Sequence, residues 1–81
     1  MAKARVYVTL KKSVFDPQGR TIHDALVGLG YAGVKDVRQG KFFEVDLDGL
    51  PVEKARETAE EIARKVLSNP VIESYRVEVE G

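Results

Sequence analysis

Asp16-Pro17-Gln18-Gly19 is the stretch that decides the organisation of the chain, because it separates an apolar strand from an amphipathic helix. Aspartate is a good helix N-cap and proline fits the first helical position, so a helix is expected to begin here. Thr21 with Asp24 offers a competing start. Gly28 and Gly30 weaken and stop the helix, whose apolar stripe consists of Ile22, Ala25, Leu26 and Leu29.

The segment before this stretch alternates between apolar and polar residues. Val6, Val8 and Leu10 share one face, and Tyr7 and Thr9 lie on the other. Strict alternation with a period of two predicts a half-buried strand.

The segment from Val34 to Asp48 also reads as strand, with Gly40 in its middle. A hairpin turn at Gln39-Gly40 is one interpretation, but it would place polar Asp36 opposite Phe43. A single long strand that bends at Gly40 keeps its apolar residues in phase, and we favour this interpretation. Such a strand is long enough to serve two sheets at once.

The second half of the chain predicts a helix and a strand. Pro51 opens the helix, and Asn69-Pro70 ends it because the residue before proline is disfavoured in the α region. Apolar residues recur at helical spacing between these points, at Val52, Ala55, Ala59, Ile62, Ala63, Val66 and Leu67. The final strand alternates through Val71, Tyr75, Val77 and Val79.

These elements predict one α+β domain spanning residues 1–81. Their order is β-α-β-(β)-α-β, which resembles the ferredoxin-like plan of an antiparallel sheet with both helices on one face. With 81 residues, the chain would bury only about 60% of its unfolded surface, so the core is marginal unless a partner covers more of it.

Composition argues against several function classes. Thirteen basic and thirteen acidic residues cancel, so no net field favours nucleic acid or anionic lipid. The chain has no cysteine and one histidine, which disfavours a zinc site. Apolar runs are far shorter than the roughly 20 residues that cross a bilayer. The first residues lead into a strand without a secretory signal pattern, so we expect a cytoplasmic protein.

The candidate chemical motifs have structural explanations. Gly28 to Gly33 match G-x-G-x-x-G, but a helix precedes them and a strand follows, the reverse of a dinucleotide site. Phe42 and Phe43 are adjacent and point to opposite faces, unlike the stacking aromatics of RNA-binding sheets. His23 has no partner pattern typical of catalysis or metal binding. We therefore expect no catalytic, metal-binding or cofactor-binding residues in this chain.

Several aromatic and apolar residues fall outside the principal core positions. Tyr7, Phe42 and Ile72 alternate away from the core residues, and Phe15 lies in a connection. A small sheet with helices on one side leaves edges and a partly apolar face exposed. The pattern predicts an interaction module that oligomerises or docks into a larger protein.

Five segments together resemble a known family. They are Val6–Lys12, Asp16-Pro17-Gln18-Gly19, Gly30-Tyr31, Gly40-Lys41 and Asn69-Pro70-Val71-Ile72-Glu73. The chain is similar over essentially its whole length to PurS, the small S subunit of bacterial and archaeal phosphoribosylformylglycinamidine (FGAM) synthase.

The resemblance implies a non-catalytic assembly subunit in de novo purine synthesis. The complex converts formylglycinamide ribonucleotide, glutamine and ATP to FGAM, ADP, phosphate and glutamate. A glutaminase subunit (PurQ) releases ammonia, and a large synthetase subunit (PurL) holds ATP and Mg²⁺. The S subunit forms dimers or tetramers, partly through shared long strands, and brings the other two together. The matching residues that we expect to contact partners are Asp16, Pro17, Gln18, Gly19, Tyr31, Lys41 and Asn69.

Two rival functions remain open. Ferredoxin-like dimers can form regulatory modules that bind small ligands such as amino acids, and stabilisation by a free ligand would favour this class. Binding of nucleic acid would appear as salt-dependent RNA retention, which we do not expect.

Overall fold

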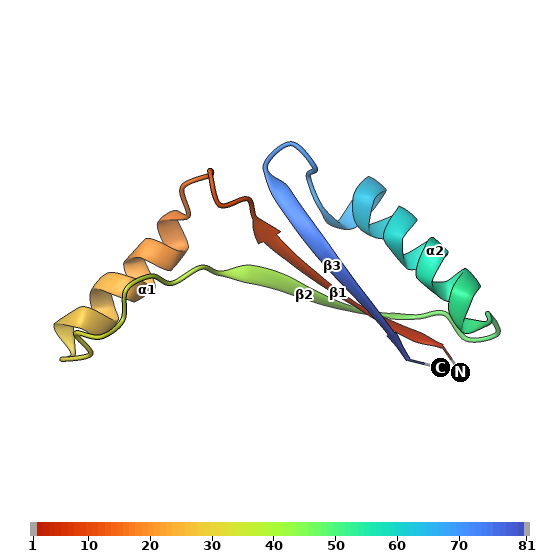
Figure 1. Ribbon diagram of the computed structural model, residues 1–81, viewed down its shortest axis with the longest axis horizontal. Coiled ribbons are helices and arrows are strands. Elements are labelled where there is room, and N and C mark those ends of the chain that lie inside the picture. Colours follow the sequence, from red (N-terminus) through yellow and green to blue (C-terminus); the bar gives the residue numbers. More distant parts are fainter. Residues whose placement is uncertain (1, 81) are drawn as a thin grey trace.

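The computed structural model describes residues 2–80, which form three strands and two helices (Figure 1). A wider π-helical turn, η1 (Ala63–Leu67), continues the second helix. The bounds in chain order are β1 Lys3–Leu10, α1 Pro17–Gly28, β2 Gly40–Asp46, α2 Val52–Ile62 and β3 Glu73–Glu80. The predicted order of elements and the α+β class are confirmed.

The three strands form an antiparallel sheet in the order β2-β1-β3, with β1 in the centre. Val6 of β1 lies opposite Phe43 of β2 and Val77 of β3. The next residue, Tyr7, lies opposite Phe42 and Arg76. Because neighbouring residues point to opposite faces, this register sorts the strand residues into a core face and an outer face.

The core lies between α2 and the core face of β1 and β3. Ala55, Ala59 and Ala63, spaced four residues apart along one side of the helix, are fully buried. Their small side chains let the helix approach Val6 and Val8, which are also fully buried. Phe43, Leu67 and Val77 pack around this centre but stay partly exposed. The buried core is therefore small and consists largely of alanine and valine.

The first helix begins as expected but does not cover the sheet. Asp16 is its N-cap and Pro17 its first residue. The expectation that both helices lie on one face of the chain's own sheet is not met, since α1 projects from the end of the sheet (Figure 1). Its apolar stripe stays open to solvent, with Ile22 40% and Leu29 75% exposed.

The segment between α1 and β2 accounts for this position. Strand pairing begins only at Gly40 rather than at Val34, and every ladder partner of β2 belongs to β1. Residues 34–39 continue the line of β2 toward α1 instead of turning back on it (Figure 1). The chain thus follows the favoured long course through Gly40 rather than the hairpin, although only its second half is paired. The last strand likewise begins at Glu73, two residues later than the pattern predicted.

The protomer is elongated and open. It measures 49 × 25 × 14 Å, with a radius of gyration of 15.9 Å. A compact chain of this length would have a radius of gyration of about 12 Å. The difference comes from α1 and residues 34–39, which extend beyond the sheet. In the described part of the chain, no helix combines the length and apolar character needed to cross a membrane.

Candidate functional site

Several side-chain hydrogen bonds hold the junction between α1 and β2, and Asp16 lies at its centre. One carboxylate oxygen, Oδ1, accepts the backbone N–H of Gly19 at 2.9 Å, which caps the helix. The other, Oδ2, accepts the backbone N–H of Gln39 at 2.7 Å. Asp16 is only 5% exposed. These hydrogen bonds, Gly19 first and then Gln39, lower the pKa of the Asp16 carboxyl despite its burial, and the nearby Arg38 charge lowers it further.

Close backbone contact reinforces the junction. Gly19 is buried, and a Cβ atom there would lie 2.2 Å from the carbonyl oxygen of Val37. Only glycine therefore lets the first turn of α1 pack against the segment before β2. Arg38 donates hydrogen bonds to the carbonyl oxygens of Lys11 and Val14, at 3.0 and 2.8 Å. The loop after β1 is thereby attached to the same segment.

A cleft of about 190 Å³ opens beside this junction. Gln18 lines it, and its Oε1 accepts a hydrogen bond from Gln39 Nε2 at 2.8 Å. Lys41 also lines the cleft, and its ammonium group lies 3.4 Å from a carboxylate oxygen of Glu73. The remaining lining residues are Val8, Leu10, Asp16, Gln39, Gly40 and Glu73. Its rim thus offers carboxamide groups and an ion pair, which suit polar contacts with another polypeptide.

Asn69 is linked to the same cleft through Glu73. The backbone N–H of Asn69 donates to Glu73 Oε1 at 2.7 Å, while the other oxygen of that carboxylate faces Lys41. The Asn69 side chain accepts the N–H of Val71 at 3.1 Å and so closes the turn before β3. The structure therefore connects three motif segments of the sequence, those containing Asp16, Lys41 and Asn69, in one region, together with Gln39.

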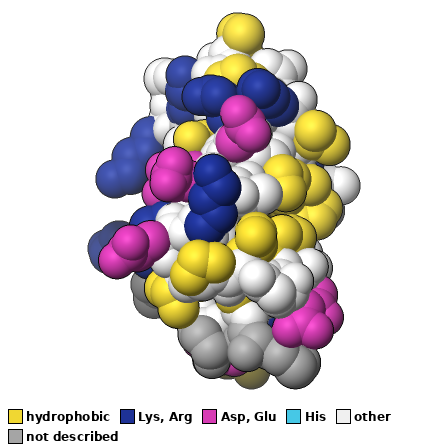
Figure 2. Space-filling model, turned by 90° about the vertical axis from the view of Figure 1, so that its right-hand side faces the viewer, with side chains coloured by type: hydrophobic (Ala, Val, Ile, Leu, Met, Phe, Trp, Pro, Cys, Tyr) yellow, Lys and Arg dark blue, Asp and Glu magenta, His cyan; other side chains and the backbone are white. Residues whose placement is uncertain are grey.

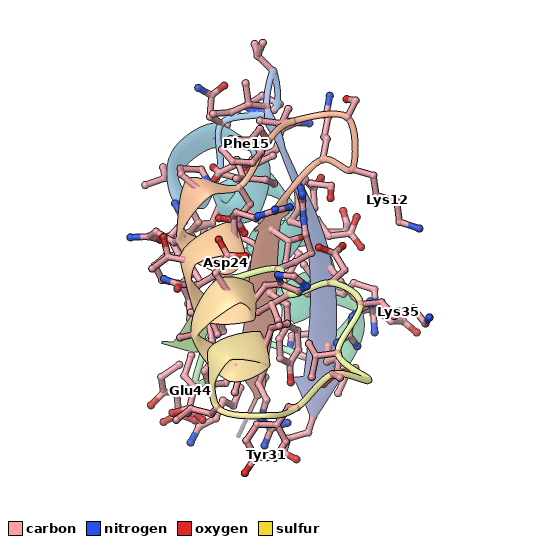
Figure 3. All side chains as sticks on the ribbon, turned by 90° about the vertical axis from the view of Figure 1, so that its left-hand side faces the viewer. Lys12, Phe15, Asp24, Tyr31, Lys35 and Glu44 are labelled. Atoms are coloured by element: carbon pink, nitrogen blue, oxygen red, sulfur yellow. The ribbon has the colours of Figure 1, made fainter. Side chains whose placement is uncertain are left out.

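Tyr31 lies apart from this cluster. Phe15 and Tyr31 mark opposite ends of α1 (Figure 3). Both are largely solvent-exposed, at 68% and 60%. Of the seven residues predicted to contact partners, Tyr31 is thus the one that the fold does not bring to the junction.

The outer face of the sheet has no helix over it within residues 2–80, and an aromatic row crosses it. The rings of Tyr7 and Phe42 lie 5.1 Å apart, and the guanidinium of Arg76 lies 4.3 Å above the Tyr7 ring. Phe42 is 53% exposed. At the α2 end of the molecule, charged side chains flank a strip of hydrophobic ones (Figure 2). Apolar surface is therefore available on the outer face of the sheet and at the α2 end of the molecule.

The described residues offer little for chemistry. Among residues 2–80, no group of three or more histidine or acidic side chains is arranged to hold a metal ion. His23 Nδ1 lies 3.0 Å from the carboxylate of Asp24 on exposed α1. This contact lowers the pKa of Asp24, with Arg20 adding to the effect. A solvated pair of this kind on a helix surface is typical of a structural contact.

Two residues of the junction were missed by sequence reasoning. Gln39 was considered only as part of a turn, and its contact with Asp16 depends on tertiary structure. Glu73 belongs to a recognised motif segment, but its pattern indicated a strand position rather than a partner for Lys41 and Asn69. Alternation of apolar and polar residues carries no signal for either contact.

Comparisons with known proteins agree on one family. The family model PurS, described as phosphoribosylformylglycinamidine (FGAM) synthase, matches residues 3–81. The PurS subunit of Methanocaldococcus jannaschii is 45% identical over 80 residues, covering 99% of this chain and 96% of that protein. The PurS subunit of Bacillus subtilis is 45% identical over 84 residues, covering 99% and 94%.

Solved structures give the same result. The crystal structure of M. jannaschii PurS superimposes with a TM-score of 0.88 at 44% identity, covering 99% of this chain and 96% of that one. A chain in the structure of PurLQS from Thermotoga maritima gives a TM-score of 0.85 at 30% identity, covering 99% of both chains.

Proposed function

Because this chain belongs to the PurS family of FGAM synthase, we propose that it is the non-catalytic assembly subunit of that enzyme. In this role it brings the glutaminase PurQ and the large synthetase PurL together, so that ammonia released from glutamine reaches the synthetase. The family match over residues 3–81 supports treating the whole chain as one PurS-like domain.

The observation that carries the proposal is the incomplete protomer. Its radius of gyration is 15.9 Å, against about 12 Å for a compact chain. The difference arises because α1 and residues 34–39 extend beyond the sheet and do not pack on it (Figure 1). A second copy can supply a sheet for them to pack on. We therefore propose that the working unit is a homodimer, or a tetramer built from dimers.

The geometry favours a symmetric dimer in which the two copies exchange chain segments along their β2 strands. This strand is an edge of the sheet, and residues 34–39 prolong it past the end of β1. A two-fold axis near Gly40 would lay residues 34–39 of each copy along the free β2 edge of the other. The partner's α1 would then cover Phe43 and Val45, which stay partly exposed because α2 packs over β1 and β3. Each half of the dimer would thus acquire the ferredoxin-like arrangement.

The structural likeness to a chain of the T. maritima PurLQS complex supports PurL and PurQ as the partners. We propose that Gln18 and Lys41 at the cleft, Asn69 in the adjoining turn and Tyr31 at the end of α1 contact these subunits. Asp16, Pro17 and Gly19 support this surface from within the junction.

The reaction assigned to the assembly consumes formylglycinamide ribonucleotide, glutamine and ATP, and yields FGAM, ADP, phosphate and glutamate. We propose that ATP and Mg²⁺ bind to the synthetase subunit and that neither binds to this chain. We propose the cytoplasm as the location, as expected for a complex of nucleotide biosynthesis.

Reconstitution tests this function. PurL and PurQ are mixed with and without the chain, and FGAM formation is measured with glutamine as nitrogen donor. The chain should be required for this reaction. An ammonium salt is the control donor, since free ammonia bypasses the glutaminase and should support synthesis without the chain. Undiminished glutamine-dependent synthesis in its absence would contradict the proposal.

A further inference from the structure

We propose that Asp16 is a latch that positions an exchangeable arm, residues 16–39, for docking onto a second copy of the chain. The arm comprises α1 and the segment that leads to β2. This inference rests on the homo-oligomer proposed above and names the residue that prepares the protomer for it.

The first step of the argument is that Asp16 makes more bonds than helix capping needs. A cap requires one oxygen to accept an N–H in the first turn, and Oδ1 does this with Gly19. The second oxygen reaches Gln39, at the other end of the arm. One buried carboxylate therefore ties the start of α1 to the residue before β2, and it closes the arm into a loop.

The second step is that neighbouring contacts leave this loop little freedom. Gly19 packs directly on Val37, where no Cβ fits. Arg38 attaches the same segment to the carbonyl oxygens of Lys11 and Val14. On the sheet side, a Cβ at Gly40 would lie 2.5 Å from the carbonyl oxygen of Val8, so β2 starts flat against β1. The arm is thus held from both sides where it joins the sheet.

The third step concerns the direction in which the arm is held. With Gln39 bonded to Asp16, residues 34–39 run alongside α1 and away from the free edge of their own β2. Folding back into a hairpin would require this bond and the Gly19–Val37 contact to break. The latch therefore keeps the arm open for the partner's β2 edge and reduces the loss of conformational freedom on association.

Asp16→Asn separates the latch from the helix cap. Asparagine caps helices about as well as aspartate, so its carbonyl oxygen retains the bond to Gly19. Its amide group then faces the Gln39 N–H and cannot accept it. We expect the dimer dissociation constant to rise about tenfold or more in sedimentation equilibrium, as for loss of one charge-assisted hydrogen bond. The Gln39 amide should also lose its protection from hydrogen exchange.

Two further variants provide an independent test of the latch and a control. Gln39→Pro removes the donor from the other side of the latch and should weaken association similarly. Asp24→Asn is the matched control, because Asp24 also lies on the arm but its ion pairs among residues 2–80 are surface contacts with Arg20 and His23. It should leave both readouts unchanged. Circular dichroism checks that the core around Val6, Val8 and Ala63 is folded in every variant.

The outcomes separate this inference from the proposed function. Wild-type affinity in both latch variants, with the Gln39 amide still protected in Asp16→Asn, would overturn the latch while leaving the dimer intact. A wild-type chain that never dimerises would overturn the homo-oligomer. Even then, protection of the Gln39 amide in the wild type that is lost in Asp16→Asn would establish the latch within the protomer. A Gln39 amide that is unprotected in the wild type, or equally protected in both proteins, would refute the latch.

Discussion

The carboxylate of Asp16 accepts the backbone N–H of Gln39 at 2.7 Å, although the two residues lie 23 positions apart. This bond joins the start of α1 to the entrance of β2 and sets how the arm leaves the sheet. A residue that the sequence presents as a helix cap thus also determines the outline of the protomer.

The latch makes the stability of the protein depend on pH in a defined direction. Because the pKa of Asp16 is lowered in the folded protein, folding favours the charged form. Its contribution is fully present above the pKa of the unfolded chain, about 3.9, and is lost as pH falls through the folded value. Urea titrations of wild type and Asp16→Asn should differ by a constant free energy from pH 7 to about 5, and the difference should shrink below about pH 4. A gap that widens in acid would contradict this account.

Gly19→Ala should destabilise the fold, because the new Cβ would collide with the Val37 carbonyl oxygen. Overpacking of this kind costs about 1–3 kcal/mol in the free energy of unfolding. Gly28→Ala is the matched control, since no atom of the described residues outside α1 and the chain neighbours of Gly28 lies within 4 Å of a Cβ there. At the end of a helix, that change should be neutral or stabilise by about 0.4–1 kcal/mol. Equal unfolding midpoints for the two variants would refute the close contact.

Ile22→Ser should weaken the homo-oligomer and leave the protomer core intact. Ile22 is 40% exposed on the arm, and the proposed exchange buries it in both copies. The substitution removes this burial at both symmetry-related sites of the dimer. The loss weakens the free energy of association by roughly 1–2 kcal/mol, which corresponds to about a tenfold rise in the dissociation constant. Val71→Ser provides the control, because Val71 is 77% exposed in the turn before β3. Analytical ultracentrifugation should separate the two; indistinguishable affinities would argue against burial of α1.

Gln18→Ala should affect partner subunits more than self-association. The side chain lies in the exposed rim of the cleft and is not required for helix initiation. In the reconstituted reaction, we expect the concentration of this chain that gives half-maximal glutamine-dependent synthesis to rise by about tenfold, the loss of roughly one hydrogen bond. Glu57→Ala, an exposed change on α2, serves as the control. An unchanged half-maximal concentration would remove Gln18 from the proposed surface.

Local patterns in the sequence predicted the local elements well. Alternation around Val6 and Val8 predicted β1, Asp16-Pro17 predicted the start of α1, and the alanine-rich periodicity predicted α2. Each of these signals depends on a few neighbouring residues. The stripe through Ile22 and Leu29 was recognised as apolar, but periodicity cannot tell whether the chain's own sheet or another copy covers it.

The site was predictable only in part for the same reason. Asp16, Gln18 and Lys41 stood out in motif segments, and the structure brings them to one junction. Gln39 and Glu73 complete that junction through contacts between distant parts of the chain. The course of residues 34–39 also depends on such contacts, since Gly40 allowed both a hairpin and a long strand. The phase of the apolar residues favoured the long strand, and the bond to Asp16 and the packing on Gly19 hold residues 34–39 in that course.

The central claim is that one copy of this chain is structurally incomplete and is completed by another. Sedimentation equilibrium of the wild-type protein at micromolar concentration tests it most directly. The account predicts a mass twice, or four times, that of one chain. A mass equal to one chain at every concentration tested would contradict it.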